Sequence, residues 1–174
     1  MIDFFWRLPG PHPDICAKVE IRGIKWGKVV ELIFQGTSAL TLDGKGRFAV
    51  PARQRDTLAA LSGNLLTITQ HPVGCLLVFP RPAWVGFRSQ LLGLPMDADG
   101  WRRFFVGSAV DVELDSAARV LVPPELRAVA GLDKDVLLLG MGQRLELWDA
   151  AKYAAHQAQV MAGPMPDAIK SFVF

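Results

Sequence analysis

Two stretches of the chain, LDGKGRFAVP and LDSAARVLVP, place an aspartate four positions before an arginine. The pairs are Asp43 with Arg47 and, 72 residues later, Asp115 with Arg119. A carboxylate at the start of a tight turn can accept hydrogen bonds from backbone N–H groups and pair with a guanidinium. For both aspartates this predicts a structural role, in which each pair locks a turn, rather than direct contact with a ligand.

Basic residues gather around the first pair and are sparse around the second. The first turn and the segment after it contain Lys45, Arg47, Arg53 and Arg55. The matching window of the second copy contains Arg119 and Arg127, and Glu125 stands where Arg53 stands in the first. Because two copies would share whatever their fold requires, the extra cations indicate phosphate or base-edge contacts, with Arg47 the first candidate. A solvated basic turn is the alternative that this spacing leaves open.

The segments around both pairs have the apolar spacing of strands. Apolar residues alternate before each aspartate and after each arginine, which predicts a strand, a tight turn and a second strand. The proline that follows in each copy favours the start of a short helix, PARQRDTLAAL in the first and PPELRAVAGL in the second. Two further apolar segments come next, NLLTIT with CLLVF and DVLLLG with RLELW. We therefore predict an internal duplication of a β-β-α-β-β unit.

The predicted fold class is α+β. A four-stranded unit of this size has little core of its own, so the two units are expected to pair and form one pseudo-twofold β barrel. The predicted parts are an N-terminal extension at 1–33, a first repeat at 34–82, a helical linker at 83–107, a second repeat at 108–151 and a C-terminal helix and tail at 152–174. Helical apolar spacing, interrupted at Pro95, predicts a helical hairpin in the linker.

Composition and charge narrow the class of protein. The 174 residues are 51% hydrophobic and carry a net charge of +2, so any basic surface must be local. Cys16 and Cys75 lie far apart without the spacing of a zinc module, which fits a reducing compartment. No apolar run approaches the ~20 residues of a membrane span, and the first residues lack the pattern of a signal peptide. We expect a cytoplasmic protein without a membrane partner.

An enzyme is the main competing class. His71 near Cys75 could suggest a nucleophile with its base, and Asp97 with Asp99 a pair of carboxylates. His71 lies in a predicted hairpin loop, Cys75 opens an apolar strand, and no third, orienting group is apparent. The glycines at 140–142 lack the rest of a nucleotide-binding fingerprint. Three scattered histidines do not have the spacing of metal ligands. The sequence therefore predicts no catalytic residue, metal, cofactor or small-molecule substrate.

With these motifs, the chain resembles the MraZ family of bacterial transcriptional regulators, whose members have two AbrB-like half-repeats. The resemblance extends almost continuously from Phe34 to Tyr153 and rests on FQGTSALTLDGKGRFAVPARQR and DVELDSAARVLVPPELR with the segments after them, HPVGCLLVFPRPAW and GLDKDVLLLGMGQRLELWD. It implies a swapped-hairpin β barrel, homo-oligomeric rings and a nucleoid-associated protein. It also implies repression of a division and cell-wall gene cluster, through double-stranded DNA at short G-rich direct repeats upstream of the protein's own gene.

The resemblance also implies roles for individual residues. Asp43 and Asp115 match the signature aspartates, and the DNA-facing basic positions of the first half are matched by Lys45, Arg47, Arg53 and Arg55. Arg119 matches the second signature, but its turn lacks the glycines and lysine of the first, so both DNA contact and barrel stability stay open for it. The alternatives for the whole chain are a structural ring protein and an antitoxin-like binding module without this DNA target.

The first 33 residues depart from the family pattern, which begins near Phe34. They include Arg22, Lys25 and Lys28 and show no clear period. One interpretation is a disordered or helical extension, and another is translated upstream DNA behind a start codon placed too early. Trp26-Gly27 can be encoded only by TGGGG and one further base, so this stretch of the gene could hold the G-rich repeats themselves.

Overall fold

The computed structural model describes residues 33–172. The predicted N-terminal extension, with Cys16, Arg22, Lys25 and Lys28, lies outside the described residues except for its last position. The statements about structure that follow concern the described residues.

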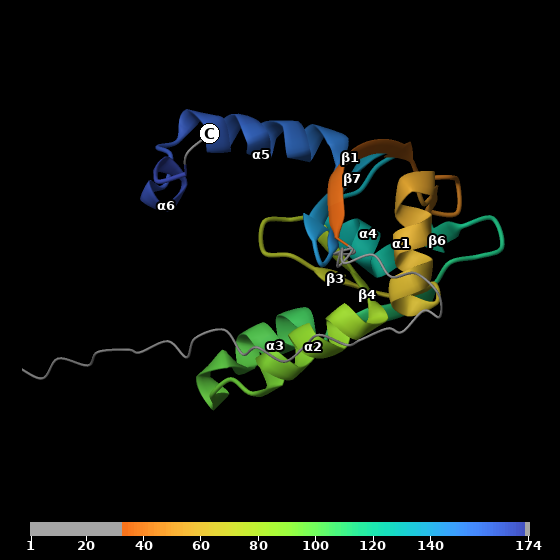
Figure 1. The fold of residues 1–174 in the computed structure, drawn as a ribbon, viewed down its shortest axis with the longest axis horizontal. Coiled ribbons are helices and arrows are strands. Elements are labelled where there is room, and N and C mark those ends of the chain that lie inside the picture. Colours follow the sequence, from red (N-terminus) through yellow and green to blue (C-terminus); the bar gives the residue numbers. More distant parts are fainter. Residues whose placement is uncertain (1–32, 173–174) are drawn as a thin grey trace, which may run out of the picture. The chain divides into compact units, whose positions relative to one another are not determined.

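The same order of elements occurs twice along the chain (Figure 1). The first series is β1 (Phe34–Thr41), β2 (Arg47–Ala49), α1 (Ala52–Ser62), β3 (Leu65–Gln70) and β4 (Leu76–Pro80). The second series is β5 (Val110–Glu113), β6 (Arg119–Leu121), α4 (Pro124–Ala130), β7 (Asp135–Gly142) and β8 (Leu145–Asp149). Between the two series lie α2 (Arg81–Leu92), the short 3₁₀ helix η1 (Met96–Ala98) and α3 (Asp99–Phe105). The chain continues after β8 with α5 (Ala150–Ala162) and α6 (Asp167–Lys170).

Every sheet combines strands of both series. Six antiparallel strands are ordered β1-β7-β8-β4-β3-β5, and β2 pairs with β6 in a separate two-stranded ribbon. The first strand of each series therefore pairs with the third strand of the other, since β1 lies on β7 and β5 lies on β3. The mixed α and β class is confirmed by this arrangement. The expected closed barrel is not found, because the large sheet stays open with β1 and β5 as its edge strands and the ribbon pairs only within itself.

The main core lies between the large sheet, the ribbon and the helices α1 and α4. Phe48 of β2 and Val120 of β6 are directly paired, and both are almost fully buried. Leu58 of α1 and Ala130 of α4 occupy equivalent positions in the two repeats, and both pack into the same cluster together with Leu126. Because each repeat supplies half of this core, neither repeat can bury its apolar residues alone.

The ends of α1 and α4 are set by proline and glycine. Pro51 and Pro123 precede the helices with φ of −58° and −53°, which suits the first turn of a helix. Gly63 and Gly131 end them in the left-handed region, with φ of 55° and 57°. These caps fix where each hairpin is followed by its helix.

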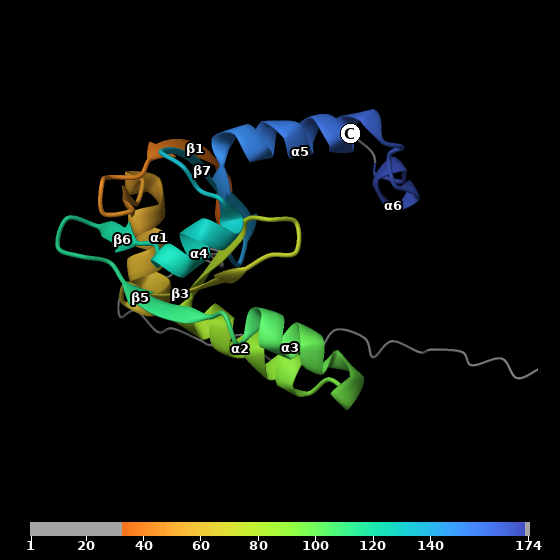
Figure 2. The same cartoon turned by 180° about the vertical axis from the view of Figure 1, so that it is seen from behind.

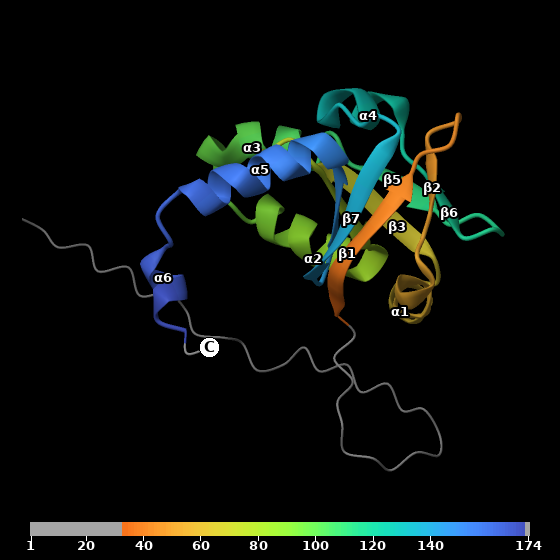
Figure 3. The same ribbon diagram turned by 90° about the horizontal axis from the view of Figure 1, so that it is seen from above.

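The opposite face of the sheet is covered by helices outside the duplicated units. α2 packs on β4, where Trp84 and Phe87 of the helix contact Phe79 of the strand. Phe87 also contacts Phe105 of α3 edge to face, with 5.5 Å between the ring centroids, and α2 and α3 form a helical hairpin (Figure 2). α5 begins at its N-cap Asp149, whose carboxylate accepts two backbone N–H groups, and then leads away from the sheet (Figure 3). Within residues 33–172 no helix combines the length and the apolar character needed to cross a membrane.

Candidate nucleic-acid interface

The two turns that carry the Asp–Arg pairs project side by side from the same end of the fold (Figures 1 and 2). The ribbon of β2 and β6 joins their second strands. Beyond the ribbon, Val50 N donates to Ala118 O at 2.9 Å and Val122 N donates to Gly46 O at 3.0 Å. The turns are therefore one rigid pair, in which each is held by the backbone of the other.

Inside each turn the aspartate binds both the backbone and the arginine. Asp43 Oδ1 accepts hydrogen bonds from the N–H groups of Lys45 and Arg47 at 2.9 and 3.0 Å. Its other oxygen, Oδ2, accepts from Arg47 Nε at 2.8 Å and pairs with Nη2 at 2.7 Å. In the first turn one carboxylate thus binds two backbone N–H groups and the guanidinium at once.

The second turn repeats the first almost atom for atom. Asp115 Oδ1 accepts from the N–H groups of Ala117 and Arg119, each at 2.9 Å. Its Oδ2 accepts from Arg119 Nε at 2.8 Å and pairs with Nη2 at 2.7 Å. Because both turns use the same bonds, the lock itself cannot explain why only the first turn is rich in cations.

The ion pairs shift the acid–base equilibria of both turns. The Arg47 side-chain hydrogen bond lowers the pKa of Asp43 to about 2, helped by the backbone N–H of the same residue. The Arg119 side-chain hydrogen bond lowers the pKa of Asp115, and the same bond raises the pKa of Arg119. The two turns also interact, because Arg47 Nη1 lies 4.0 Å from Asp115 Oδ2. Both aspartates are therefore ionised and both arginines are held in place at neutral pH.

The turns differ at the position before each arginine. Gly46 has φ of +79°, and the Arg127 guanidinium lies against it where a methyl group would stand. The equivalent residue, Ala118, has φ of +54°, a conformation that costs an L-residue free energy. The first turn therefore needs glycine both for its backbone and for the close approach of Arg127. The sequence alone identifies Arg127 only as one of the two cations in the matching window of the second repeat, because nothing local indicates that it reaches the turn of the first.

The structure brings only some of the predicted basic residues to the turns. Lys45 lies exposed in the first turn, two positions before Arg47. Arg53 is directed to β1, where Nη2 donates to Thr37 O and Ser38 Oγ, both at 2.6 Å. Arg55 Nε donates to Val50 O at 2.7 Å. Two of the five predicted DNA contacts thus already bind the protein's own backbone.

The groups considered for an enzyme are placed unfavourably for catalysis. Burial raises the pKa of the Cys75 thiol to about 12 and lowers the pKa of His71. These two residues are connected through their backbone, by a hydrogen bond from His71 N to Cys75 O of 3.0 Å. Asp99 pairs with Arg102 on its own helix. Across the part of the chain that the structure describes, no three His, Cys, Asp or Glu side chains are grouped as metal ligands.

Two equivalent turns, each locked by an Asp–Arg pair and carried on an interlocked two-repeat scaffold, define a class of duplicated, hairpin-presenting α+β proteins. A sequence profile of the family described as "MraZ protein, putative antitoxin-like" matches residues 33–104 and again 105–168. The chain belongs to the MraZ family.

Full-length relatives support this assignment. The protein named transcriptional regulator MraZ from Methylibium petroleiphilum is 60% identical over 146 residues, which are 84% of this chain and all of the relative. The protein of the same name from Leptothrix cholodnii is 60% identical over 141 residues, 81% of this chain and 97% of its own. That from Burkholderia vietnamiensis is 58% identical over 142 residues, 82% of this chain and all of its own.

Proposed function

We propose that this protein is a sequence-specific DNA-binding transcriptional regulator that represses its own division and cell-wall gene cluster. Its relatives are named transcriptional regulators, and the pair of rigid turns supports the DNA-binding part of the proposal. The observation that carries it is the first turn, where the fixed guanidinium of Arg47 and the exposed ammonium group of Lys45 lie together. The second turn has the same structure but no lysine, so the fold does not require Lys45.

The proposed target is double-stranded DNA with short G-rich direct repeats upstream of the gene. An arginine can donate two hydrogen bonds to the O6 and N7 acceptors of guanine in the major groove. Arg47 is the best candidate for such a contact, because Asp43 fixes its guanidinium through Nε and Nη2, while Nη1 has only the more distant Asp115 carboxylate, at 4.0 Å. Lys45 is proposed to bind a phosphate next to it.

The other predicted contacts have graded roles in this proposal. Arg119 is the second candidate, since it is locked as firmly as Arg47 but has no lysine beside it. Arg53 and Arg55 are proposed to support the interface, because their guanidinium groups already bind backbone oxygens. Asp43 and Asp115 are proposed to position the arginines rather than touch DNA, which would repel them.

The proposed assembly is a homo-oligomeric ring in the cytoplasm, associated with the nucleoid. One pair of turns covers only a few base pairs, so several subunits acting together would provide affinity for spaced repeats. Large apolar side chains that are exposed on the helices support contacts between copies: Leu92, Met96, Trp101, Val160 and Met161. In this proposal each subunit is organised as swapped-hairpin AbrB-like repeats at 34–82 and 108–151, with the linker at 83–107 between them and the tail at 152–174.

The test is fluorescence-anisotropy binding to a duplex with three GTGGG repeats one helical turn apart, against a scrambled duplex, over a salt series. Lys45→Ala is the sharper variant, because no side-chain partner in the described part of the chain depends on Lys45, whereas Arg47→Ala also unlocks its turn. Arg103→Ala is the matched control, since it removes an exposed cation from α3.

We expect the parent and Arg103→Ala to bind the repeats and not the scrambled duplex. Loss of the Lys45 phosphate contact should weaken binding and reduce the salt slope by about 0.9, while Arg47→Ala should abolish the preference for the repeats. Equal binding of all four proteins to both duplexes would refute the proposal. It would favour a structural ring protein or an antitoxin-like module without this DNA target.

A further inference from the structure

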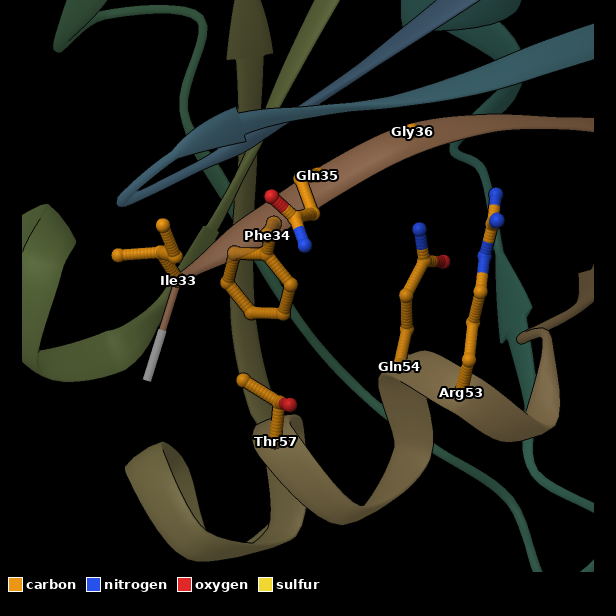
Figure 4. A pocket seen from close by; sticks show the side chains of 7 residues that line it. All are labelled: Ile33, Phe34, Gln35, Gly36, Arg53, Gln54 and Thr57. Atoms are coloured by element: carbon orange, nitrogen blue, oxygen red, sulfur yellow. The ribbon is translucent and has the colours of Figure 1, made fainter. Parts of the chain in front are cut away.

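A cleft of about 500 Å³ lies between the beginning of β1 and the helix α1, away from the two turns (Figure 4). One wall is the backbone and side chains of 33–36, and the other wall is formed by Arg53, Gln54 and Thr57 of α1. A groove between an edge strand and a helix has the shape that accepts an extended chain.

The cleft contains a buried amide without a partner. The side chain of Gln54 points from α1 toward β1 at Gln35 and Gly36 in Figure 4. Gln54 is only 3% exposed, and neither its Nε2 nor its Oε1 has a hydrogen-bond partner among the described residues. An unpaired buried amide costs about 1–3 kcal/mol, so a stable fold would not be expected to keep one at this position for packing alone.

The second repeat shows that the fold does not need this amide. At the position equivalent to Gln54 it has Leu126, which is 1% exposed and packs into the main core. The neighbours on the helix differ as well, since Glu125 and Val129 stand where the first repeat has Arg53 and Thr57. At these three positions the helix of the second repeat has one acidic and two apolar side chains. The helix of the first repeat has a cation, an amide and a hydroxyl group there.

The strand beside the cleft has an open edge. Among residues 33–172, β1 pairs with β7 on one side only and is the last strand of the large sheet. Arg53 binds Thr37 O and Ser38 Oγ farther along β1. Residues 33–36, at the start of the strand, line the cleft. An unpaired strand edge is a template for another extended chain, and a primary amide such as that of Gln54 offers one donor and one acceptor, as a peptide group does.

The charge of the cleft indicates what kind of chain would bind. Arg53 lines it, and no carboxylate is among the described residues that line it. Within the described residues, the guanidinium of Arg53 makes no ion pair and bonds only to neutral oxygens through Nη2. An aspartate or glutamate in the bound chain would therefore find a cation that the fold leaves without a counter-charge.

We propose that the groove between β1 and α1 binds an extended acidic peptide segment of a partner protein, which adds to the edge of β1 and pairs with the Gln54 amide. About four residues of the peptide would lie opposite 33–36, at the spacing of an antiparallel strand. The groove shares Arg53 with the proposed DNA interface, but none of the residues of the two turns lines it, so peptide binding and DNA binding can be tested separately.

The experiment is selection of random hexapeptides displayed on phage against the full-length protein, with counter-selection against Gln54→Leu. That variant copies the residue of the second repeat and is expected to fold. Gln157→Leu, the same change at an exposed position of α5, is the matched control. Selected peptides are then synthesised, and their binding is measured by fluorescence anisotropy together with that of forms in which each acidic residue is replaced by its amide.

We expect acidic, extended peptides that bind the parent and Gln157→Leu equally and bind Gln54→Leu at least about tenfold more weakly. Replacement of the acidic residue should weaken binding, and the peptide should protect the amide hydrogens of 33–36 from exchange.

The proposal is overturned if no peptide survives counter-selection, or if the peptides bind Gln54→Leu as well as the parent. It is also overturned if sedimentation shows that Gln54→Leu, and not Gln157→Leu, dissociates an oligomer, because a second copy would then occupy the groove. DNA binding measured on the same variants keeps this outcome separate from that of the proposed function.

Discussion

The exchange of Gly46 and Ala118 between the two turns should change stability in opposite directions and by unequal amounts. Both residues have positive φ. At Gly46, however, the Arg127 side chain lies where an added methyl group would be placed. Gly46→Ala and Ala118→Gly are therefore matched changes of one methyl group in two nearly identical turns.

The magnitudes follow from the backbone and from packing. An L-residue in the left-handed region costs about 1–2 kcal/mol, and glycine costs about 0.4–1 kcal/mol through the greater freedom of the unfolded chain. Ala118→Gly should therefore raise the free energy of unfolding by about 0.5–1 kcal/mol. Gly46→Ala should lower it by the same backbone amount and by about 1 kcal/mol more, because the methyl group must displace the Arg127 guanidinium.

The assay is urea unfolding followed by circular dichroism at one fixed protein concentration, since an oligomer makes stability depend on concentration. Arg127→Ala, alone and combined with Gly46→Ala, completes a double-mutant cycle that isolates the packing part of the cost. The reasoning would be refuted if Ala118→Gly lowered stability, or if Gly46→Ala cost the same with and without Arg127.

Three further changes test other contacts. Asp149→Ala should lower the free energy of unfolding by about 1 kcal/mol and reduce helical circular dichroism, because its carboxylate caps α5; an unchanged spectrum would contradict this. Gln54→Leu should raise the free energy of unfolding by about 1–2 kcal/mol in urea titrations, since it removes an unpaired buried amide; a loss of stability would show that the amide is satisfied. The pKa values of Asp43 and Asp115 lie below the ordinary 3.8, so the stability that they contribute is complete above about pH 4 and is lost as the pH falls toward 2. Urea midpoints measured between pH 2 and 5 should fall less steeply for the double Asp→Asn variant, and parallel curves would disprove this contribution.

Local signals allowed the hairpins and helices to be predicted from the sequence. The alternation around Asp43 and Asp115, followed by a proline, is contained within about a dozen residues, and such patterns depend little on the rest of the fold. The helix predicted from Pro51 is found at Ala52–Ser62, and the one predicted from Pro123 at Pro124–Ala130. The locked geometry of both turns was predictable for the same reason.

Long-range features could not be predicted in this way. A period of two identifies β1 and β7 as strands, but it does not say that each repeat pairs its first strand with the third strand of the other, or that the sheet stays open. The sequence also could not show that Arg53 binds β1 instead of standing beside Arg47, because this depends on where the edge strand lies. Gln54 gave no signal at all, since a glutamine on a short helix is ordinarily exposed.

The pairing of β1 with β7 has a consequence for folding during translation. Ser38 pairs with Leu138, so β1 must wait for one hundred residues of further synthesis before its partner exists. At a translation rate of about 5–20 residues per second, this delay is about 5–20 s. During that time the nascent first repeat exposes strands that β5, β7 and β8 will later cover. The large sheet can be completed only after β8 has been synthesised, so the protein folds as one unit rather than repeat by repeat.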